Sequence, residues 1–87
     1  MEKLSVYVFT TKNVVIKRKP VLRIYYDEDG DLQFLDGMQS PRIEDAMLIS
    51  LGEMLQIDCD LLSVVSELQR GEFAIRKDVG FPWKIGK

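Results

Sequence analysis

Three carboxylates at alternate positions are the residues most able to bind a metal ion. Asp27, Asp29 and Asp31 stand in a five-residue run that includes Gly30, and alternating carboxylates are the first ligands of an EF-hand calcium loop. The match ends there, because that loop needs its glycine at the sixth position and a bidentate glutamate at the twelfth, where this chain has Met38. An Asp-Gly pair between two apolar runs is typical of a tight turn. We therefore expect a solvated hairpin turn, with no metal and no other cofactor.

The side chains of the common hydrolytic mechanisms are missing from the chain. It has no histidine, and this excludes Ser-His-Asp and Cys-His nucleophiles and the usual zinc sites. The single cysteine, Cys59, lies between Asp58 and Asp60, whose negative charges disfavour the reactive thiolate. The glycines are too scattered to form a phosphate-binding loop. We expect a protein that is not an enzyme.

Charge is distributed unevenly along the sequence. The net charge is −2, but residues 27–72 hold twelve acidic and two basic side chains, and both flanking segments are basic. Two interpretations remain open. Opposite charges interleave in the fold and cancel, or the basic ends lie side by side in a sheet and give the molecule one positive and one negative face, suited to charge-steered protein association. The isoelectric point near 5.0 predicts no nucleic-acid partner, because phosphate neutralisation favours a positive balance.

Length and composition predict one globular domain over residues 1–87. A chain of this size has room for a single core, and 46% hydrophobic with 30% charged residues is a globular balance. No apolar run is long enough to cross a bilayer, the first residues do not form a signal-peptide pattern, and one cysteine makes no internal disulfide. We expect a cytoplasmic protein with no membrane partner.

The first half of the chain has the pattern of three strands joined by polar segments. The predicted elements are strands over residues 4–10, 21–26 and 32–35, a break at Lys12-Asn13, a short apolar piece over 14–16 and a basic loop over 17–20. The second and third strands flank the Asp-Gly turn, so they form the clearest hairpin in the sequence.

Two helices are predicted in the second half. A polar connection over 36–45 leads to residues 46–49, which fit either a short buried strand or the lead-in to a helix. Ser50 and Glu53 match a capping box, so a helix is expected over residues 51–57. Asp60 is a good N-cap for a second helix that Gly71 ends at the C′ position. The apolar stripe of this second helix consists of Leu61, Leu62, Val64, Val65 and Leu68.

A last strand and an extended tail complete the prediction. The strand covers residues 72–77, with Phe73 and Ile75 on one face, and the tail covers 81–85, with Trp83 packed on the core. The helices cluster after the hairpin instead of alternating with strands. This order favours an α+β fold, in which a small antiparallel sheet of about four to five strands has two short helices packed on one face.

Three stretches of the sequence together resemble a known family. They are Asp29-Gly30-Asp31-Leu32-Gln33-Phe34-Leu35-Asp36-Gly37, then Leu48-Ile49-Ser50-Leu51-Gly52-Glu53-Met54-Leu55 leading to Asp58, then Gly71-Glu72-Phe73-Ala74-Ile75-Arg76 followed by Pro82-Trp83. In this order they are similar to a family of small, mostly uncharacterised bacterial domains, some of which are described as immunity proteins against polymorphic toxins. The similarity covers residues 20–84, and its motifs are turns and core positions, so it implies the fold more than the function.

Two functions are therefore expected from the sequence. The first is a non-catalytic protein-binding module of immunity type, whose acidic stretch covers a basic toxin domain. The alternative is a small accessory or regulatory domain that forms a homodimer through a sheet edge or the Trp83 surface, with ligand sensing as one form of this role. The candidate partner-binding residues are Asp27, Glu28, Asp29, Asp31, Asp36, Glu44, Asp45 and Trp83.

Overall fold

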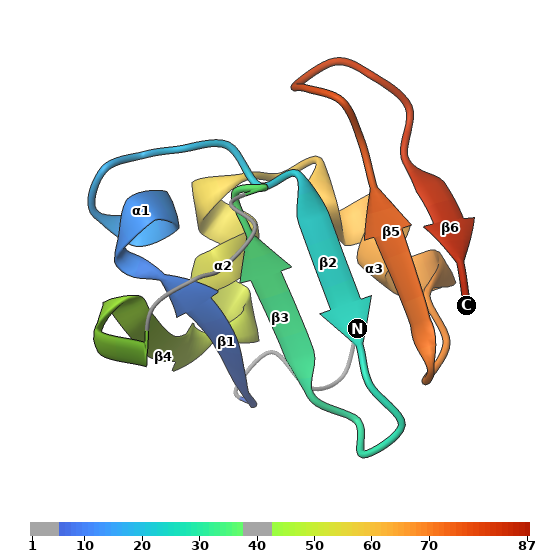
Figure 1. The fold of residues 1–87 in the computed structure, drawn as a ribbon, viewed down its shortest axis with the longest axis horizontal. Coiled ribbons are helices and arrows are strands. Elements are labelled where there is room, and N and C mark those ends of the chain that lie inside the picture. The colour runs from blue at the N-terminus through green and yellow to red at the C-terminus, as the bar shows by residue number, and fades with distance from the viewer. Residues whose placement is uncertain (1–5, 38–42) are drawn as a thin grey trace.

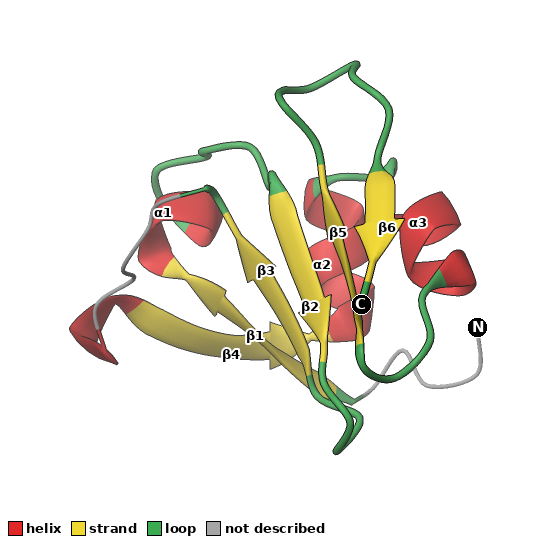
Figure 2. Cartoon of the chain, turned by 45° about the vertical axis from the view of Figure 1, so that its right-hand side comes forward, coloured by secondary structure: helices red, strands yellow, loops and turns green. Residues whose placement is uncertain are grey.

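A single mixed β-sheet with helices across one face forms the architecture. The structure, a computed structural model, describes residues 6–37 and 43–87. Figures 1 and 2 show helices α2 and α3 on the same side of the sheet. The strands are β1 (Tyr7–Thr11), β2 (Arg23–Tyr26), β3 (Leu32–Leu35), β4 (Ala46–Ser50), β5 (Glu72–Ile75) and β6 (Lys84–Gly86). The helices are α1 (Lys12–Val15), the short 3-10 helix η1 (Ile43–Asp45), α2 (Leu51–Ile57) and α3 (Leu61–Glu67).

The α+β class is confirmed, but the sheet differs from the expected one in two respects. It has six strands in the order β4-β1-β3-β2-β5-β6, one more than the upper end of the expected range. It is also mixed, because β1 runs parallel to β3 while every other neighbouring pair is antiparallel. Strand patterns in a sequence do not state which strands become neighbours, so this parallel pair was not predicted. Three strands separate β1 from β6, so these first and last strands do not lie side by side.

The predicted hairpin is present at the centre of this sheet. Strands β2 and β3 pair antiparallel, with Tyr25 opposite Gln33. Asp27 organises the turn, because its Oδ1 accepts from the backbone N–H groups of Asp29 at 3.0 Å and Asp31 at 2.9 Å. Gly30 has φ of 93°, the left-handed conformation that glycine adopts at least cost. The Asp-Gly signal therefore predicted this turn correctly.

The hydrophobic core lies between the sheet and helices α2 and α3. Ile24 faces Phe34 on one neighbouring strand and Ala74 on the other, and all three side chains are fully buried. Directly opposed residues share a face of the sheet, so these three mark the covered face. The helices contribute apolar residues at helical spacing. These are Leu51 and Met54 from α2, and Leu61, Val64 and Val65 from α3.

Helix α2 begins and ends as the sequence predicts. Ser50 Oγ accepts from the backbone N–H of Glu53 at 3.1 Å, and Glu53 Oε1 accepts from the backbone N–H of Ser50 at 3.2 Å. These reciprocal bonds form the capping box and satisfy two backbone donors at the start of the helix. The strand before it, β4, confirms the strand interpretation of residues 46–49, but it is not buried, since Ala46 and Leu48 are exposed.

Helix α3 corrects three details of the prediction. Asp60 is the N-cap residue, as predicted, but it has helical backbone angles and its side chain makes no capping bond. The backbone N–H of Asp60 itself donates to Asp58 Oδ1 at 3.0 Å. Leu62 points to solvent with 47% of its surface exposed. The helix ends at Glu67 with Leu68 as its C-cap, so Gly71 is not the C′ residue and instead forms the turn into β5, with φ of 87°.

The short helix α1 replaces the break expected at Lys12-Asn13. Thr11, the last residue of β1, caps it, because its hydroxyl oxygen accepts from the Val14 N–H at 3.4 Å. Val14 is fully buried in the core. A threonine cap and one buried valine are sufficient to form a single helical turn where composition alone suggests a loop.

The C-terminal part of the chain is extended as predicted. Residues 84–86 form β6, which pairs antiparallel with β5 and places Ile75 opposite Lys84. Trp83, just before this strand, is half-buried against the core, which confirms its expected packing. None of the helices in the described part of the chain is long and apolar enough to cross a bilayer.

Candidate docking surface

Within residues 6–37 and 43–87, no helix packs on the second face of the sheet (Figure 1). Figure 1 looks directly onto this face, with α2 and α3 behind the strands. Residues that oppose one another across neighbouring strands share a face, so the pairing registers define a transverse row. From β4 to β5 this row consists of Leu48, Phe9, Gln33, Tyr25 and Phe73. We call the side of the sheet that carries this row the open face.

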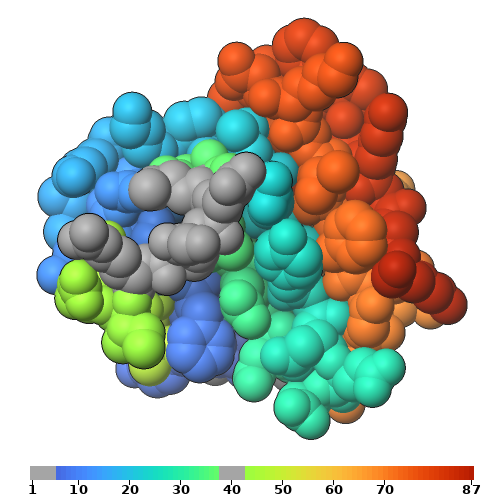
Figure 3. Space-filling model, viewed as in Figure 1, coloured from blue at the N-terminus to red at the C-terminus, as the bar shows by residue number. Residues whose placement is uncertain are grey.

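Large apolar side chains are exposed on the open face. The exposed fractions are 71% for Tyr7, 57% for Leu48, 42% for Phe9 and 39% for Ile75. Figure 3 shows this side of the molecule in space-filling form. Tyr7, Phe9 and Leu48 lie on the neighbouring strands β1 and β4, whereas Ile75 lies on β5, with β3 and β2 between. Single exposed apolar residues are normal on protein surfaces, but a group on one sheet face makes that face a candidate interaction site.

Aromatic rings in the middle of the open face are held in defined positions. The rings of Tyr25 and Phe73 lie 6.2 Å apart between centroids and are tilted by 38°. The Phe73 ring also covers Gly86 on β6, where an added Cβ would lie 2.8 Å from Phe73 Cζ. Gly86 therefore provides the space into which this ring packs. A rigid aromatic surface loses little conformational entropy when a partner covers it.

The charges on the open face are of one sign. Among the strand residues that the registers place on this face, Arg23 and Lys84 are basic, and both are direct neighbours of Ile75. The described strands place no acidic side chain on this face. The face is therefore apolar at its centre with a basic border, and this arrangement was not foreseen in the sequence.

The first four candidate partner-binding residues lie in the turn between β2 and β3. Asp27 uses its carboxylate to hold the turn, so it has a structural role there. Glu28 packs beside Gly71, where an added Cβ would lie 3.5 Å from Glu28 Cγ. The third and fourth residues, Asp29 and Asp31, are exposed at the tip of the hairpin.

The turn at Gly71, which leads into β5, packs against the hairpin turn between β2 and β3. Arg70 lies over Gly30, where an added Cβ would be 3.0 Å from Arg70 Nη2, and the Gly71 N–H donates to the Tyr26 carbonyl at 2.7 Å. Each turn thus has a glycine beneath a charged side chain of the other. Part of the acidic cluster is consequently used in packing the fold.

The remaining acidic candidates lie at the other end of the sheet. Asp36 directly follows β3, while Glu44 and Asp45 form part of η1, which leads into β4. Strands β1 and β3 are parallel, and Thr11 at the end of β1 pairs with Ala46 at the start of β4. The end of β3 and the start of β4 therefore lie at the same end of the strands, opposite the hairpin turn. The structure therefore divides the acidic candidates between two ends of the molecule.

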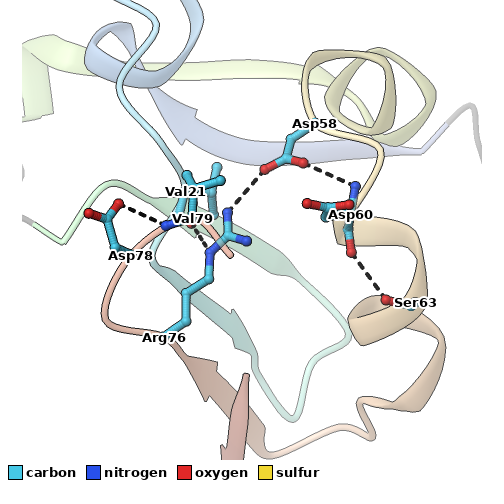
Figure 4. Close-up of polar contacts among 7 residues, drawn as sticks. All are labelled: Val21, Asp58, Asp60, Ser63, Arg76, Asp78 and Val79. Carbon is cyan, nitrogen blue, oxygen red and sulfur yellow. Dashed lines mark hydrogen bonds and ion pairs between the residues drawn. The ribbon is translucent and has the colours of Figure 1, made fainter. Parts of the chain in front are cut away.

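Trp83 lies on the buried arginine Arg76. The Arg76 guanidinium carbon is 4.4 Å from the centre of the Trp83 ring, a cation–π contact. Its Nε donates to the Val21 carbonyl at 3.0 Å, and its Nη2 pairs with Asp58 Oδ2 at 3.1 Å (Figure 4). The side chain is only 2% exposed. This cluster joins β5, the segment before β2 and the α2–α3 connection. Trp83 therefore packs on a group of residues that stabilises the fold.

Sequence reasoning missed the residues that dominate the open face. Tyr7, Phe9, Tyr25 and Leu48 were read as ordinary strand residues, and only Phe73 and Ile75 were assigned to a common face. The alternation of Tyr7 and Phe9 in β1 was the available signal, but it does not tell which face the helices cover. Among the described residues, no group of three or more acidic or cysteine side chains is arranged to hold a metal ion.

The structure also contains a cavity at the hairpin end of the sheet. It has a volume of about 520 Å³, within the range of small-molecule sites. Its walls include Leu32 and Val65 from the core, together with Tyr26 and Arg70. Comparisons with known proteins add no assignment to either surface, since no family model, curated protein or solved structure matches this chain.

Proposed function

We propose that this protein is a non-catalytic binding module that docks a partner protein on the open face of its sheet. The observation that supports this is the exposure of Tyr7, Phe9, Leu48 and Ile75 on one surface. Covering such a surface removes apolar area from water, which favours association. Aromatic residues and a basic border are also typical of interface composition, in which tyrosine, phenylalanine and arginine are enriched.

The partner expected for this face has an apolar centre and acidic groups at its border. These acidic groups would face Arg23 and Lys84, the two basic strand residues beside Ile75. An immunity-type inhibitor is one form of this function, with a toxin as the partner. We place the encounter in the cytoplasm, because the single cysteine, Cys59, is exposed and free.

A matched pair of leucine variants tests the proposal. Leu48 lies on the open face and Leu62 on α3, and their exposed fractions are similar at 57% and 47%. We expect Leu48→Lys to abolish capture of a stoichiometric partner by the tagged protein from lysate of its host, and Leu62→Lys to retain it. Urea unfolding of both variants checks that the fold is intact.

A third variant separates the open face from the acidic turn. Asp29→Lys reverses a charge at the exposed tip of the hairpin, away from the open-face row. Loss of the partner with Asp29→Lys and retention with Leu48→Lys would contradict the open-face proposal and support the acidic site expected from the sequence. Capture that is unchanged in both variants would contradict both sites.

The cavity of about 520 Å³ favours a second candidate function, a small self-associating regulatory domain that senses a ligand. Its walls combine apolar residues with one acidic and one basic side chain, Asp31 and Arg70, a combination suited to a small apolar ligand that carries a polar group. Val65→Phe should fill the space and remove any increase in melting temperature caused by a ligand from the host metabolite extract. Sedimentation at increasing protein concentration tests self-association; a monomer whose melting temperature no extract fraction changes would rule this candidate out.

A further inference from the structure

One corner of the open face is hollowed into a basic pocket. It has a volume of about 340 Å³ and lies between the end of β5 and the start of β6. The chain segments that form it are coloured orange to red at the right of Figure 3. The pocket is lined by Ile75, Arg76, Lys77, Phe81, Pro82 and Lys84.

The pocket combines an apolar floor with two available cations. Ile75 and Phe81 are exposed by 39% and 51%, and Lys77 and Lys84 are exposed at its rim. Arg76 does not add to this charge, because its guanidinium is buried against Asp58 and the Val21 carbonyl. Its lining residues include no acidic side chain.

The nearest acidic residue in the sequence, Asp78, keeps its negative charge but does not line the pocket. Asp78 Oδ1 accepts from the backbone N–H of Val79 at 2.7 Å. Arg23, on the neighbouring strand β2, lies on the other side of Ile75 from Lys84 and adds a third cation to this corner. The corner is therefore an apolar depression bordered by positive charge.

We propose that this pocket binds an acidic segment of the partner protein, with one apolar side chain in the depression and flanking Asp or Glu side chains paired with Lys77 and Lys84. This inference rests on the proposed function, because it names the part of the partner that the open face recognises. Exposed ion pairs alone contribute little. An apolar residue that excludes water from the pocket strengthens the adjacent ion pairs and fixes their position.

Short peptides test the pocket without the partner protein. The probe is acetyl-Asp-Phe-Glu-amide, and the matched control is acetyl-Asn-Phe-Gln-amide, which has the same shape without the charges. We expect the acidic peptide to cause saturable NMR shifts of the backbone amides of Ile75, Phe81 and Lys84. Its affinity should exceed that of the control by about tenfold, the effect of two partly exposed ion pairs.

Protein variants assign the effect to the pocket. The double variant Lys77→Met and Lys84→Met should bind both peptides equally, whereas Lys12→Met, at an exposed lysine of α1 outside the pocket, should keep the preference. Equal binding of both peptides to the unmodified protein would overturn the proposal. The same shifts caused by inorganic phosphate, with no gain from the phenylalanine, would also overturn it.

Two further outcomes separate this inference from the function on which it rests. Shifts of the same amides on raising the protein concentration, without peptide, would mean that a second copy occupies the pocket and would overturn the inference. Peptide binding with a partner that Leu48→Lys still captures would support the pocket while contradicting the open-face proposal. Loss of the partner in Leu48→Lys with no peptide preference would support the open-face proposal and contradict the pocket.

Discussion

The two faces of the sheet are built from the same strands but differ in how much of their apolar surface is buried. On the covered face, Ile24, Phe34 and Ala74 are fully buried beneath α2 and α3. On the open face, Phe9 and Leu48 occupy equivalent strand positions and remain 42% and 57% exposed. The buried residues stabilise the fold, whereas the exposed ones add surface without a comparable gain in stability. This difference in exposure is the basis of the docking proposal made above for the open face.

The largest expected effect comes from truncating one phenylalanine on each face. Phe34 in β3 and Phe9 in the neighbouring strand β1 are the same residue type with opposite environments. Phe34→Ala should lower the free energy of unfolding by about 3–5 kcal/mol, because it leaves a cavity in the core. Phe9→Ala should lower it by about 1 kcal/mol or less. Urea unfolding measures both, and equal losses would mean that the open face belongs to the core.

The next effect concerns the polar cluster at the edge of the covered face. Arg76→Ala removes the partner of Asp58 and leaves the Val21 carbonyl without its donor. We expect a loss of about 3 kcal/mol in the free energy of unfolding, as for breaking a largely buried ion pair. Lys77→Ala, at the next and exposed position, should have almost no effect on urea unfolding. A small loss in Arg76→Ala would mean that this cluster does not fix the sheet to the helices.

A smaller effect is expected where the two turns pack together. Gly30→Ala should be destabilising by about 1–2 kcal/mol, because an alanine is strained at φ of 93°, and it would also displace the Arg70 guanidinium. Gly80 has φ of 85° with nothing near its Cβ position, so Gly80→Ala reports the backbone strain alone. Thermal unfolding of the two variants separates these terms, and equal losses would show that Arg70 moves without cost.

The smallest expected effect concerns the cap of α2, which starts where β4 ends. Ser50→Ala removes the acceptor of the Glu53 N–H bond and should cost about 1 kcal/mol. Ser66→Ala is the control, since its hydroxyl only bonds the Leu62 carbonyl within α3, and such a bond adds little to helix stability. A loss in Ser66→Ala as large as that in Ser50→Ala would argue against a specific role for the capping box.

Elements that depend on nearby residues were predictable from the sequence. The Asp-Gly turn and the Ser50–Glu53 capping box each use residues that are at most four positions apart. The position of Trp83 against the core also followed from residue type. Asp60 is the N-cap residue of α3, as predicted, but the sequence did not show that its side chain would make no capping bond.

Features that depend on distant residues could not be predicted in the same way. The parallel contact of β1 with β3 brings Phe9 beside Gln33, and nothing in either strand specifies this neighbour. The open face depends on that choice, because it decides which aromatic residues form one surface. The acidic candidates belong to one acidic segment in the sequence, but the fold divides them between two ends of the sheet. Charge along a chain therefore did not predict which side chains share one surface.

The strand order also constrains how the protein is made on the ribosome. The hairpin of β2 and β3 occupies the middle of the sheet, and it is the part that a nascent chain can form early, since its pairs are local. Its neighbour β5 lies about fifty residues later in the sequence. The Arg76 side chain, which donates to the Val21 carbonyl, is likewise made 55 residues after Val21. Until then the outer edge of β2 exposes unpaired backbone groups, a recognised hazard for aggregation. The early, highly charged turn at Asp27–Asp31 is well placed to keep that intermediate apart from its copies.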